Sequence, residues 1–268
     1  MTTLAQPSAS GIVAFARNRL LGALSPDDFD RIAPHLRETA LEPGSVLHEP
    51  DQPIQRICFP SGGLVSLMAL LPDGQAIDTV TIGREGAVGL SAAIGSPTAR
   101  TRALVQLPGR ALAIPAARMA EVAERSPSLR GVIVRYGEIV MAQVQQNVVC
   151  NTAHPIQARL CRWLLQARDR TGADTLAVTQ ELLSTVLGVQ RTTITLVARV
   201  LQTEGILQVR RGRIIIGDAA ALEEKACDCY RHGRRLVEHI GRGAIRQFAQ
   251  QPLRPETGRE IQPSSSQA

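Results

Sequence analysis

The sequence is short of lysine, aromatic residues and long apolar runs. Lys225 is the sole lysine among 30 basic residues, and aromatic residues make up 3% of the 268-residue chain. Few aromatic rings argue against a protein that binds single-stranded nucleic acid by stacking bases. The longest apolar runs, such as 64–71, fall well short of the roughly 20 residues that a membrane-spanning helix needs. The N-terminus also lacks the basic and then apolar pattern of a signal peptide. We therefore expect a cytoplasmic protein without a membrane partner.

Patterns that bind metals or catalyse reactions are scarce as well. The five cysteines (58, 150, 161, 227 and 229) are scattered, and the five histidines form no HxH or HExxH pair. Cys227-Asp-Cys229 is the one local cysteine pair, and its spacing differs from the CxxC of zinc and redox sites. We predict incidental thiols here rather than a metal or redox centre, and no enzyme. The formal net charge of +6 favours a polyanionic partner.

Residues 11–125 show two sequence patterns, one typical of helices at the start and one typical of strands afterwards. Helices are predicted within 11–37, where Ser25, Pro26 and Asp28 form the start signal of a helix with a capping box. From about 38 to 114 the chain has short alternating runs punctuated by Gly, Pro and Asp. Asp73-Gly74 between two apolar runs predicts a tight hairpin. Several strands at this spacing indicate an antiparallel sandwich or roll.

Residues 126–153 are predicted to form one long helix. Apolar residues recur in steps of three and four, which makes a continuous seam along one side. The seam must be buried, either against its own domain or against the same helix of a second subunit. We expect the second arrangement, in a homodimer. The expected dimer-contact residues are Val132, Ile133, Tyr136, Ile139, Val140 and Val144.

Residues 154–231 have the pattern of a second, mainly helical domain. A helix from about 156 is followed by a short strand, by the segment 179–203, and by two short strands joined at Arg210-Arg211-Gly212. One further helix is predicted from Ala219 to about Arg231. Residues 232–268 read as a basic tail, in part disordered in composition, with a helix over 232–248 left open.

The segment 179–203 looks like one amphipathic helix interrupted by Gly188. Two helices that meet at a steep angle need a tight turn, where Gly takes positive φ easily. The first helix would bury Leu183, Val186 and Leu187, and Val189 would fill the corner. The second would bury Ile194, Val197 and Leu201. This is the pattern of a helix-turn-helix followed by a basic β-hairpin wing.

The opposite face of the second helix carries polar groups that suit DNA. Arginine donates two hydrogen bonds to guanine, and threonine contacts thymine methyl groups or phosphates. From 155 to 217 there are nine arginines and four acidic residues, a local excess of five positive charges. We read these arginines as a set of phosphate contacts. The expected DNA-binding residues are Thr179, Gln180, Gln190, Arg191, Thr192, Thr195, Arg199, Arg210, Arg211 and Arg213.

With this order of elements, the chain resembles the Crp–Fnr superfamily of bacterial transcription regulators over about residues 15–230. The resemblance implies an α+β fold: an N-terminal antiparallel β-roll (a cyclic-nucleotide-binding-like jelly roll), a long dimerisation helix and a C-terminal winged helix-turn-helix. It implies a homodimer that binds a palindromic operator in double-stranded DNA, with RNA polymerase as partner if it activates. Arg191 and Thr192 look like the base-reading pair. Thr192 replaces the usual Glu, however, and Leu196 stands where an Arg often reads a base.

The resemblance also gives an expected effector pocket at Gly86, Ala87, Val88, Arg100 and Thr101. In the cyclic-AMP-binding members a glutamate holds the ribose, and here Ala87 stands in its place. The oxygen-sensing members use an N-terminal cysteine cluster, and no cysteine precedes Cys58. We therefore predict no cofactor, neither cyclic AMP nor an iron–sulfur cluster.

Two other function classes stay open. One is a nucleotide-sensing subunit that regulates a partner enzyme, which would leave the helix-turn-helix pattern without a role. The other is a cupin-like β-roll enzyme. It would need clustered histidine and acidic ligands on strands, and His48 is the one histidine in the strand region.

Overall fold

The computed structural model describes residues 18–241. The predictions for residues 11–17 and 242–268, which include most of the expected tail, lie outside this range. At the N-terminal end, the described chain begins with short helices: η1 (Leu21–Ala23), α2 (Pro26–Ile32) and η2 (Ala33–His35). Ser25 caps α2 as predicted, since its hydroxyl accepts a hydrogen bond from the Asp28 N–H at 3.2 Å.

A β-roll of two antiparallel sheets follows. One sheet has the order β1-β7-β3 and the other β2-β6-β4-β5. The predicted hairpin joins β4 to β5, and Gly74 in its turn has φ +85°. The antiparallel roll is thus confirmed. The strands are β1 (Arg37–Leu41), β2 (Val46–His48), β3 (Arg56–Pro60), β4 (Leu64–Leu70), β5 (Ala76–Ile82), β6 (Arg102–Leu107) and β7 (Gly109–Pro115), with the short helix η3 (Leu90–Ala93) before β6.

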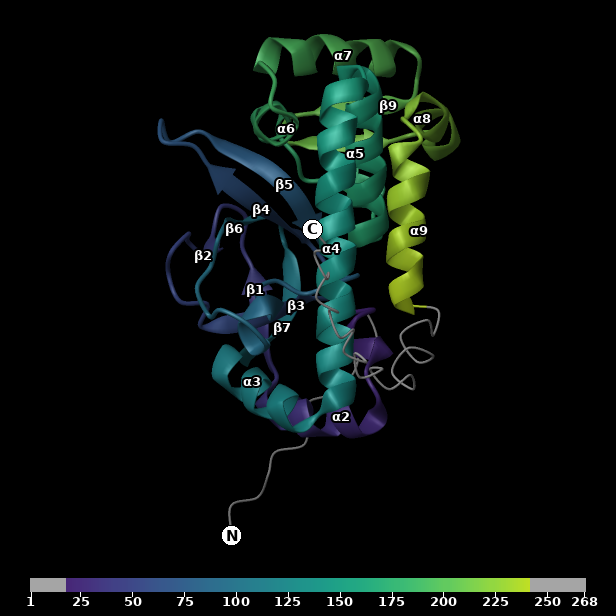
Figure 1. Ribbon diagram of the computed structural model, residues 1–268. Coiled ribbons are helices and arrows are strands. Elements are labelled where there is room, and N and C mark those ends of the chain that lie inside the picture. The colour runs from purple at the N-terminus through teal and green to yellow at the C-terminus, as the bar shows by residue number, and fades with distance from the viewer. Residues whose placement is uncertain (1–17, 242–268) are drawn as a thin grey trace, which may run out of the picture.

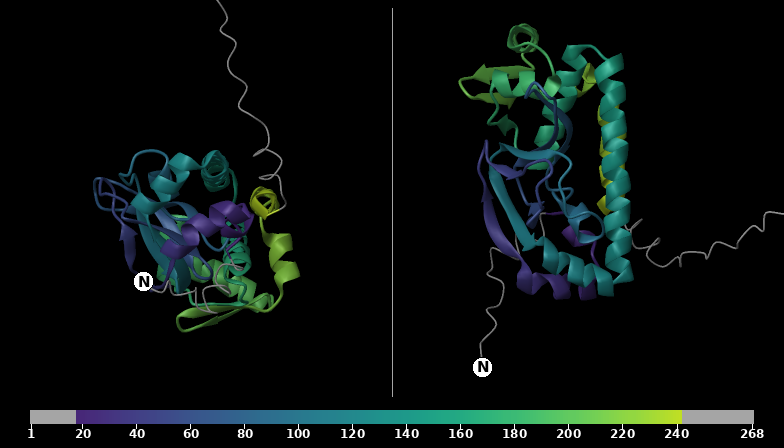
Figure 2. Two further views of the ribbon diagram at one scale, coloured as in Figure 1. Left: turned by 90° about the horizontal axis from the view of Figure 1, so that it is seen from below. Right: turned by 60° about the vertical axis from the view of Figure 1, so that its left-hand side comes forward.

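Two helices leave the roll. α3 (Ala116–Arg125) is followed by α4 (Pro127–Ala153), a single helix of 27 residues that begins at the Ser126 cap. α4 runs along the molecule beside the roll and lies at one edge of it in the right-hand view of Figure 2. The predicted long helix is therefore present with nearly the expected bounds.

The C-terminal part contains the helix-turn-helix and the wing. Its elements are α5 (Ile156–Thr171), β8 (Thr175–Leu176), α6 (Gln180–Leu187), α7 (Arg191–Thr203), β9 (Leu207–Arg210), β10 (Arg213–Ile216), α8 (Ala219–Lys225) and α9 (Cys229–Gly241). The prediction of one helix from Ala219 to Arg231 is wrong. The backbone is extended at Ala226, so α8 ends there and α9 turns back beside α4 and α5 (Figure 1).

The two parts of the chain are packed together. Leu64 and Leu107 of the roll share a hydrophobic cluster with Trp163 and other residues of the C-terminal part. A separate cluster within the roll includes Val65 and Val105. Among the described helices, none has the length and apolarity needed to cross a membrane.

Candidate nucleic-acid interface

The turn between α6 and α7 has the geometry of a helix-turn-helix. Gly188 ends α6 with φ +64°, a left-handed conformation that favours glycine. Leu183, Val186 and Leu187 are buried on α6, as predicted. On α7 the buried residues are Ile194, Ala198 and Leu201. Ala198 therefore replaces Val197, which is only half-buried, at the centre of the inner face.

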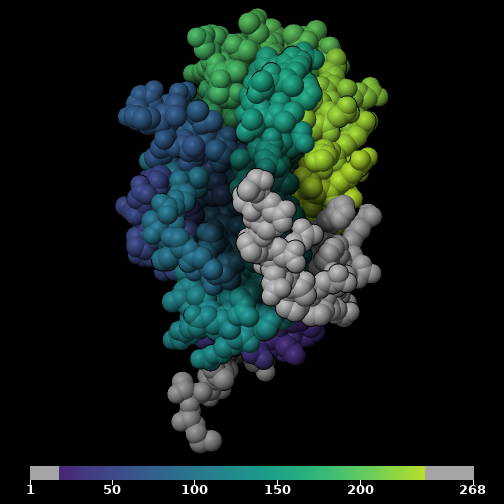
Figure 3. Space-filling model, in the orientation of Figure 1, coloured from purple at the N-terminus to yellow at the C-terminus, as the bar shows by residue number. Residues whose placement is uncertain are grey.

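The predicted reading surface lies on the outer face of α7. Arg191, Thr192 and Arg199 are exposed. Thr195 is half-buried, and its hydroxyl oxygen lies 2.8 Å from Gln180 Oε1 and 3.0 Å from the Arg191 carbonyl oxygen, which share its one proton as acceptors. Thr195 thus fixes the Gln180 side chain rather than projecting freely. α7 forms the end of the molecule opposite α2 and α3 (Figures 1 and 3).

Flanking polar residues of the predicted surface have local roles too. Thr179 caps α6, because its hydroxyl oxygen accepts from the Leu182 N–H at 3.1 Å. The Thr179 hydroxyl proton is still available to an external acceptor. Gln190 is the exposed residue before α7. The three wing arginines, Arg210, Arg211 and Arg213, are all exposed.

The wing is a short hairpin at the same end of the molecule as α7. Arg213 pairs with Arg210 across the β9–β10 ladder, and Gly212 in the turn has φ +71°. The hairpin projects beside α7 in the right-hand view of Figure 2. The predicted winged helix-turn-helix is thus confirmed in its fold.

Four of the nine arginines between 155 and 217 have structural roles, which corrects their interpretation as one set of phosphate contacts. Arg159 donates to the Leu187 carbonyl, and Arg162 is 5% exposed and donates to Asn147. Arg168 pairs with Asp174, and Arg170 with Glu85. The exposed arginines that remain are 191, 199, 210, 211 and 213, on α7 and the wing.

Two apolar residues on α7 were missing from the predicted surface. Leu196 is 62% exposed and Val200 is 46% exposed, one helical turn apart. Together they form a small exposed apolar patch on the same helix as the exposed Arg191 and Arg199. The departure of Leu196 from the family pattern is the sequence signal that points to this apolar contact surface.

The expected effector pocket is filled by the protein itself. Gly86, Ala87 and Val88 are buried, and the Ala87 N–H donates to Tyr136 Oη at 2.9 Å, which in turn donates to the Ala87 carbonyl at 3.0 Å. A Cβ added at Gly86 would lie 2.2 Å from Tyr136 Oη. Burial, together with the Glu85 charge, raises the pKa of Tyr136 and keeps its hydroxyl neutral.

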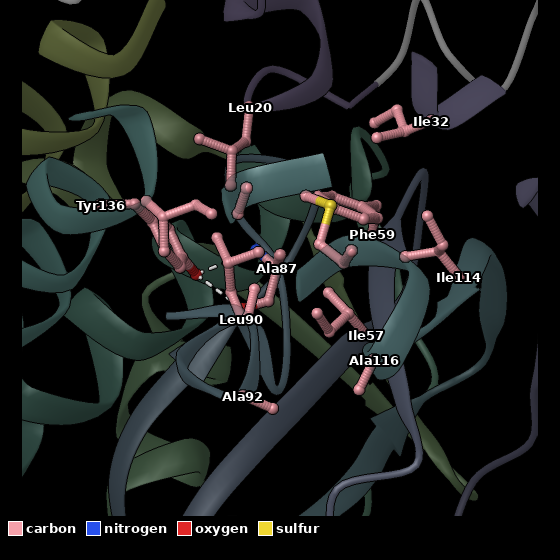
Figure 4. Packing of buried hydrophobic residues seen from close by; sticks show 14 of the residues in the cluster. Leu20, Ile32, Ile57, Phe59, Ala87, Leu90, Ala92, Ile114, Ala116 and Tyr136 are labelled. Carbon is pink, nitrogen blue, oxygen red and sulfur yellow. Dashed lines mark hydrogen bonds between the residues drawn. The ribbon is translucent and has the colours of Figure 1, made fainter. Parts of the chain in front are cut away.

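Apolar side chains complete the filling around Ala87. Figure 4 shows the Tyr136 hydroxyl of α4 pointing at Ala87, with Leu90 close by, and all three residues belong to the main core cluster of the roll. The predicted Arg100 lies elsewhere: its side chain is 77% exposed and faces Asp51 at 4.0 Å. Thr101 is half-buried beside it. These five residues therefore form no common pocket, which corrects the prediction.

A cavity of about 450 Å³ lies instead at the junction of the roll, α4, α5 and α9. Its wall is strongly polar and includes Asp78, Arg84, Glu85, Arg162 and Arg170. Several polar atoms in the wall are buried without a hydrogen-bond partner: Asp78 Oδ1, Arg84 Nε, Glu85 Oε2 and Arg162 Nε. Buried polar groups normally have partners, so this wall is suited to a polar ligand or to ordered water.

The expected dimer-contact face is turned inward. Val132, Ile133 and Tyr136 are between 4% and 6% exposed, and Ile139 and Val140 pack against the same core. These five residues bury the helix on its own roll, which was the alternative arrangement, and Val144 is half-buried. The exposed apolar residues of α4 are on the opposite face: Val134, Met141, Val148 and Val149.

Three of the cysteines meet, contrary to the prediction of scattered thiols. Cys150, Cys227 and Cys229 are buried together, and with His154 they form a group that could hold a metal ion. Cys58 and Cys161 lie apart, and burial raises their pKa values to about 11 and about 12. Those two thiols are therefore unreactive at neutral pH.

Comparison with known proteins agrees with the fold. Residues 158–225 match the Crp-like helix-turn-helix domain. Among solved structures, FixK2 from Bradyrhizobium japonicum is 16% identical, with 72% of this chain and 98% of that chain covered and a TM-score of 0.62. A putative Crp/Fnr regulator from Eubacterium rectale is 21% identical (77% and 96% covered, TM-score 0.57). A transcriptional regulator of the CRP family from Thermus thermophilus is 21% identical (70% and 96% covered, TM-score 0.58).

At these identities the likeness to solved structures shows the fold. The α+β arrangement of roll, long helix and winged helix-turn-helix is therefore confirmed. No curated protein has a matching sequence.

Proposed function

We infer that this chain is a DNA-binding transcription regulator of the Crp/Fnr type, and that it reads a two-fold-symmetric operator as a homodimer, with α7 in the major groove. We propose no enzyme activity for it. One observation carries the proposal. After the structural arginines are set aside, every exposed arginine between 155 and 217 lies on α7 or the wing, at one end of the molecule.

Direct base reading is assigned to the outer face of α7. Arg191 and Arg199 are exposed, and an arginine can donate two hydrogen bonds to guanine O6 and N7. Thr192 and Leu196 are exposed beside them, and both offer apolar groups to a thymine methyl. A mixed surface of this kind favours a site that contains both G·C and A·T pairs.

Phosphate contacts are assigned to the flanks of α7. Thr179 and Gln180 lie at the start of α6, where backbone N–H groups and the helix dipole favour an anion. Gln190 precedes α7, and Arg210, Arg211 and Arg213 are on the wing. Such contacts fix the register on the duplex and make the affinity depend on salt.

The homodimer is proposed to form through the exposed face of α4. Val134, Met141 and Val148 are spaced by seven residues, and their exposed fractions are 49%, 58% and 62%. A seven-residue repeat of apolar side chains on one helix face is the pattern that pairs two helices. An exposed apolar stripe of this length also needs a partner in water.

The regulatory signal is proposed to act at the junction cavity rather than inside the roll. The cavity is bounded by α4, α5 and α9, so a ligand there would contact the roll and the DNA-binding part together. Cyclic AMP is not the expected ligand, because Tyr136 and the core occupy the space around Ala87. Titration calorimetry with cyclic AMP should detect no heat from specific binding. Binding with micromolar affinity would refute this interpretation.

The DNA contact is tested by selection from a genomic fragment library, followed by fluorescence anisotropy on the selected site. The selected sequence should be a palindrome with half-sites about one helical turn apart. Arg191→Ala should weaken binding to this site by about 1–3 kcal/mol, while Arg118→Ala on α3 should leave it unchanged. If Arg191→Ala binds the selected site as tightly as the wild type does, the assignment of α7 to the DNA interface is wrong.

If the protein activates transcription, RNA polymerase is a further partner. If no site is selected while a partner enzyme responds to the protein, the regulatory-subunit alternative gains support. In either case we expect it to act in the cytoplasm, where the chromosome is.

A further inference from the structure

Cys150, His154, Cys227 and Cys229 come from two parts of the chain that the break after α8 brings together. Cys150 is on the last turn of α4, and His154 caps that helix four residues later, on the same side. Cys227 lies between α8 and α9, and Cys229 begins α9. The Cys150 and Cys227 sulfurs are 3.5 Å apart although the residues are 77 positions apart in sequence.

The four ligand atoms have the spacing of a single tetrahedral ion. One donor atom from each residue lies within 4.8 Å of every other. Two thiolates on one zinc ion, at about 2.3 Å each, are about 3.8 Å apart, and a thiolate and an imidazole nitrogen about 3.6 Å apart. The observed Cys150–Cys227 distance is 3.5 Å, and the Cys229 Sγ to His154 Nδ1 distance is 3.6 Å.

The surroundings suit a closed, structural metal site. Cys150, Cys227 and Cys229 are between 0% and 8% exposed. The Gln146 side-chain amide donates to Cys229 Sγ at 3.0 Å, as outer groups commonly do to thiolate ligands. Three thiolates and a neutral imidazole around a divalent ion carry one net negative charge. Arg159 and Arg162 both interact electrostatically with Cys150, and their positive charges would favour that negative charge.

We propose that Cys150, His154, Cys227 and Cys229 bind one Zn²⁺-type ion that joins the end of α4 to the start of α9. A mononuclear ion fits better than a four-iron cluster, because such a cluster places iron atoms between its thiolates and separates the sulfurs much further. The ion would anchor the segment after the wing to the long helix. It would therefore hold the DNA-binding part and α4 in one arrangement.

The test measures metal in the full chain, purified under reducing conditions and without metal-binding tags. Elemental analysis should find about one zinc per chain. Cys150→Ser and Cys227→Ser should lose nearly all of it. The matched control is Cys58→Ala, a buried cysteine of the roll outside the group, which should keep its zinc.

A second measurement, cobalt binding, uses the wild-type protein alone and so does not depend on how the variants fold. Metal-free wild-type protein titrated with Co²⁺ should develop the visible bands of tetrahedral cobalt and thiolate-to-cobalt charge transfer. Chelation should lower the melting temperature of the wild type and leave that of Cys227→Ser unchanged.

Three results would overturn the proposal. The first is wild-type protein that takes up no more zinc or cobalt than Cys150→Ser. The second is iron with acid-labile sulfide in matching amounts, which would indicate a cluster. The third is a Cys150–Cys227 disulfide found by mass spectrometry in metal-free protein as it is isolated from cells. None of these results bears on whether α7 reads DNA.

Discussion

Arg170 of α5 and Glu85 of the roll form a buried ion pair across the two parts of the chain. Arg170 Nε donates to Glu85 Oε1 at 2.7 Å, and the two side chains are 10% and 4% exposed. The Gly83 N–H donates to the same oxygen at 3.1 Å. A Cβ at Gly83 would lie 2.7 Å from Arg170 Cβ, so the arginine stem packs directly on that glycine. The pair therefore fixes the docking of the DNA-binding part on the roll.

Glu85→Gln should destabilise the protein strongly. Removing one partner leaves the Arg170 guanidinium buried without its counter-charge, which costs roughly 3–5 kcal/mol. Urea denaturation would measure the free energy of unfolding. The matched control is Glu121→Gln, because Glu121 pairs with Arg118 at the surface, where the side chains are 52% and 54% exposed. That change should cost less than about 1 kcal/mol. Equal effects of the two changes would show that the buried pair does not hold the docking.

Introducing a charge into the α4 stripe should dissociate the proposed dimer. In Met141→Asp the carboxylate would lie in the middle of the repeat Val134, Met141 and Val148, where pairing would bury it unpaired. Sedimentation equilibrium should show a shift from dimer to monomer. Far-ultraviolet circular dichroism should be unchanged, because Met141 is exposed in the single chain. Ala117→Asp on the exposed face of α3 is the control and should remain dimeric. A dimeric Met141→Asp would exclude the stripe as the interface.

A structural feature of this protein could be predicted from the sequence when the residues that form it lie close together along the chain. The helix-turn-helix was predictable because Gly188 and the buried positions all lie close together along the chain, between Leu183 and Leu201. The long helix was predictable as a helix, but not the face it presents. Both Val132 with Tyr136 and Val134 with Met141 are apolar at helical spacing, and only the folded roll shows which face is covered.

Features formed by residues far apart in the sequence could not be predicted, because only the folded chain brings those residues together. Tyr136 fills the space at Ala87 from 49 positions away. The cysteine group depends on the chain break at Ala226, which has no glycine or proline to signal it. The phosphate-contact count over 155–217 was too high, since charge alone does not distinguish Arg170 in an ion pair from Arg211 in solvent.

Arg211→Ala on the wing should reduce the salt dependence of DNA binding. If Arg211 neutralises one phosphate, the slope of log K against log salt should fall by about 1. Affinity should weaken to a similar extent on selected and unrelated DNA, because a phosphate contact carries no sequence information. Anisotropy titrations at several salt concentrations measure both quantities. Arg118→Ala removes the same net charge and should leave the slope unaltered. A sequence-dependent loss in Arg211→Ala would indicate base contact instead.

Leu196→Ala tests whether the Leu196 side chain on α7 contributes to DNA recognition without contributing to the stability of the protein. Leu196 is 62% exposed, so its truncation should change the free energy of unfolding by less than about 0.5 kcal/mol. If the side chain contacts a thymine methyl, affinity for the selected site should fall by roughly 1 kcal/mol, with little change on unrelated DNA. Ile194→Ala provides the contrast, because Ile194 is fully buried and its truncation should cost about 2–5 kcal/mol of stability. A Leu196→Ala protein with unaltered affinity and specificity would exclude this contact.

Asp78 should make the protein less stable as the pH rises from about 4 to about 6. Burial raises the pKa of Asp78 from 3.8 to about 6, against the lowering effects of the Ser66 and Thr81 hydroxyls and of the Arg170 and Arg162 charges. The folded protein therefore binds a proton more tightly than the unfolded chain does. Below about pH 4 the Asp78 carboxyl is protonated in both the folded and the unfolded state, so its ionisation does not lower the free energy of unfolding. Above about pH 6 its ionisation costs stability on the order of 2–3 kcal/mol.

Asp78→Asn removes this ionisation and keeps the shape of the side chain. The variant should gain stability relative to wild type between pH 4.5 and pH 8, by about 2–3 kcal/mol over that range. Urea denaturation at both pH values gives the difference. Asp73→Asn in the exposed β4–β5 turn is the control, since it deletes a carboxylate without altering a buried charge. A gain that is equal at both pH values would mean that Asp78 does not titrate in this window.

Asp78→Asn also bears on ligand binding in the junction cavity. A ligand that donates a hydrogen bond to Asp78 Oδ1 should bind Asp78→Asn more weakly, because the amide oxygen lacks the negative charge that strengthens this hydrogen bond.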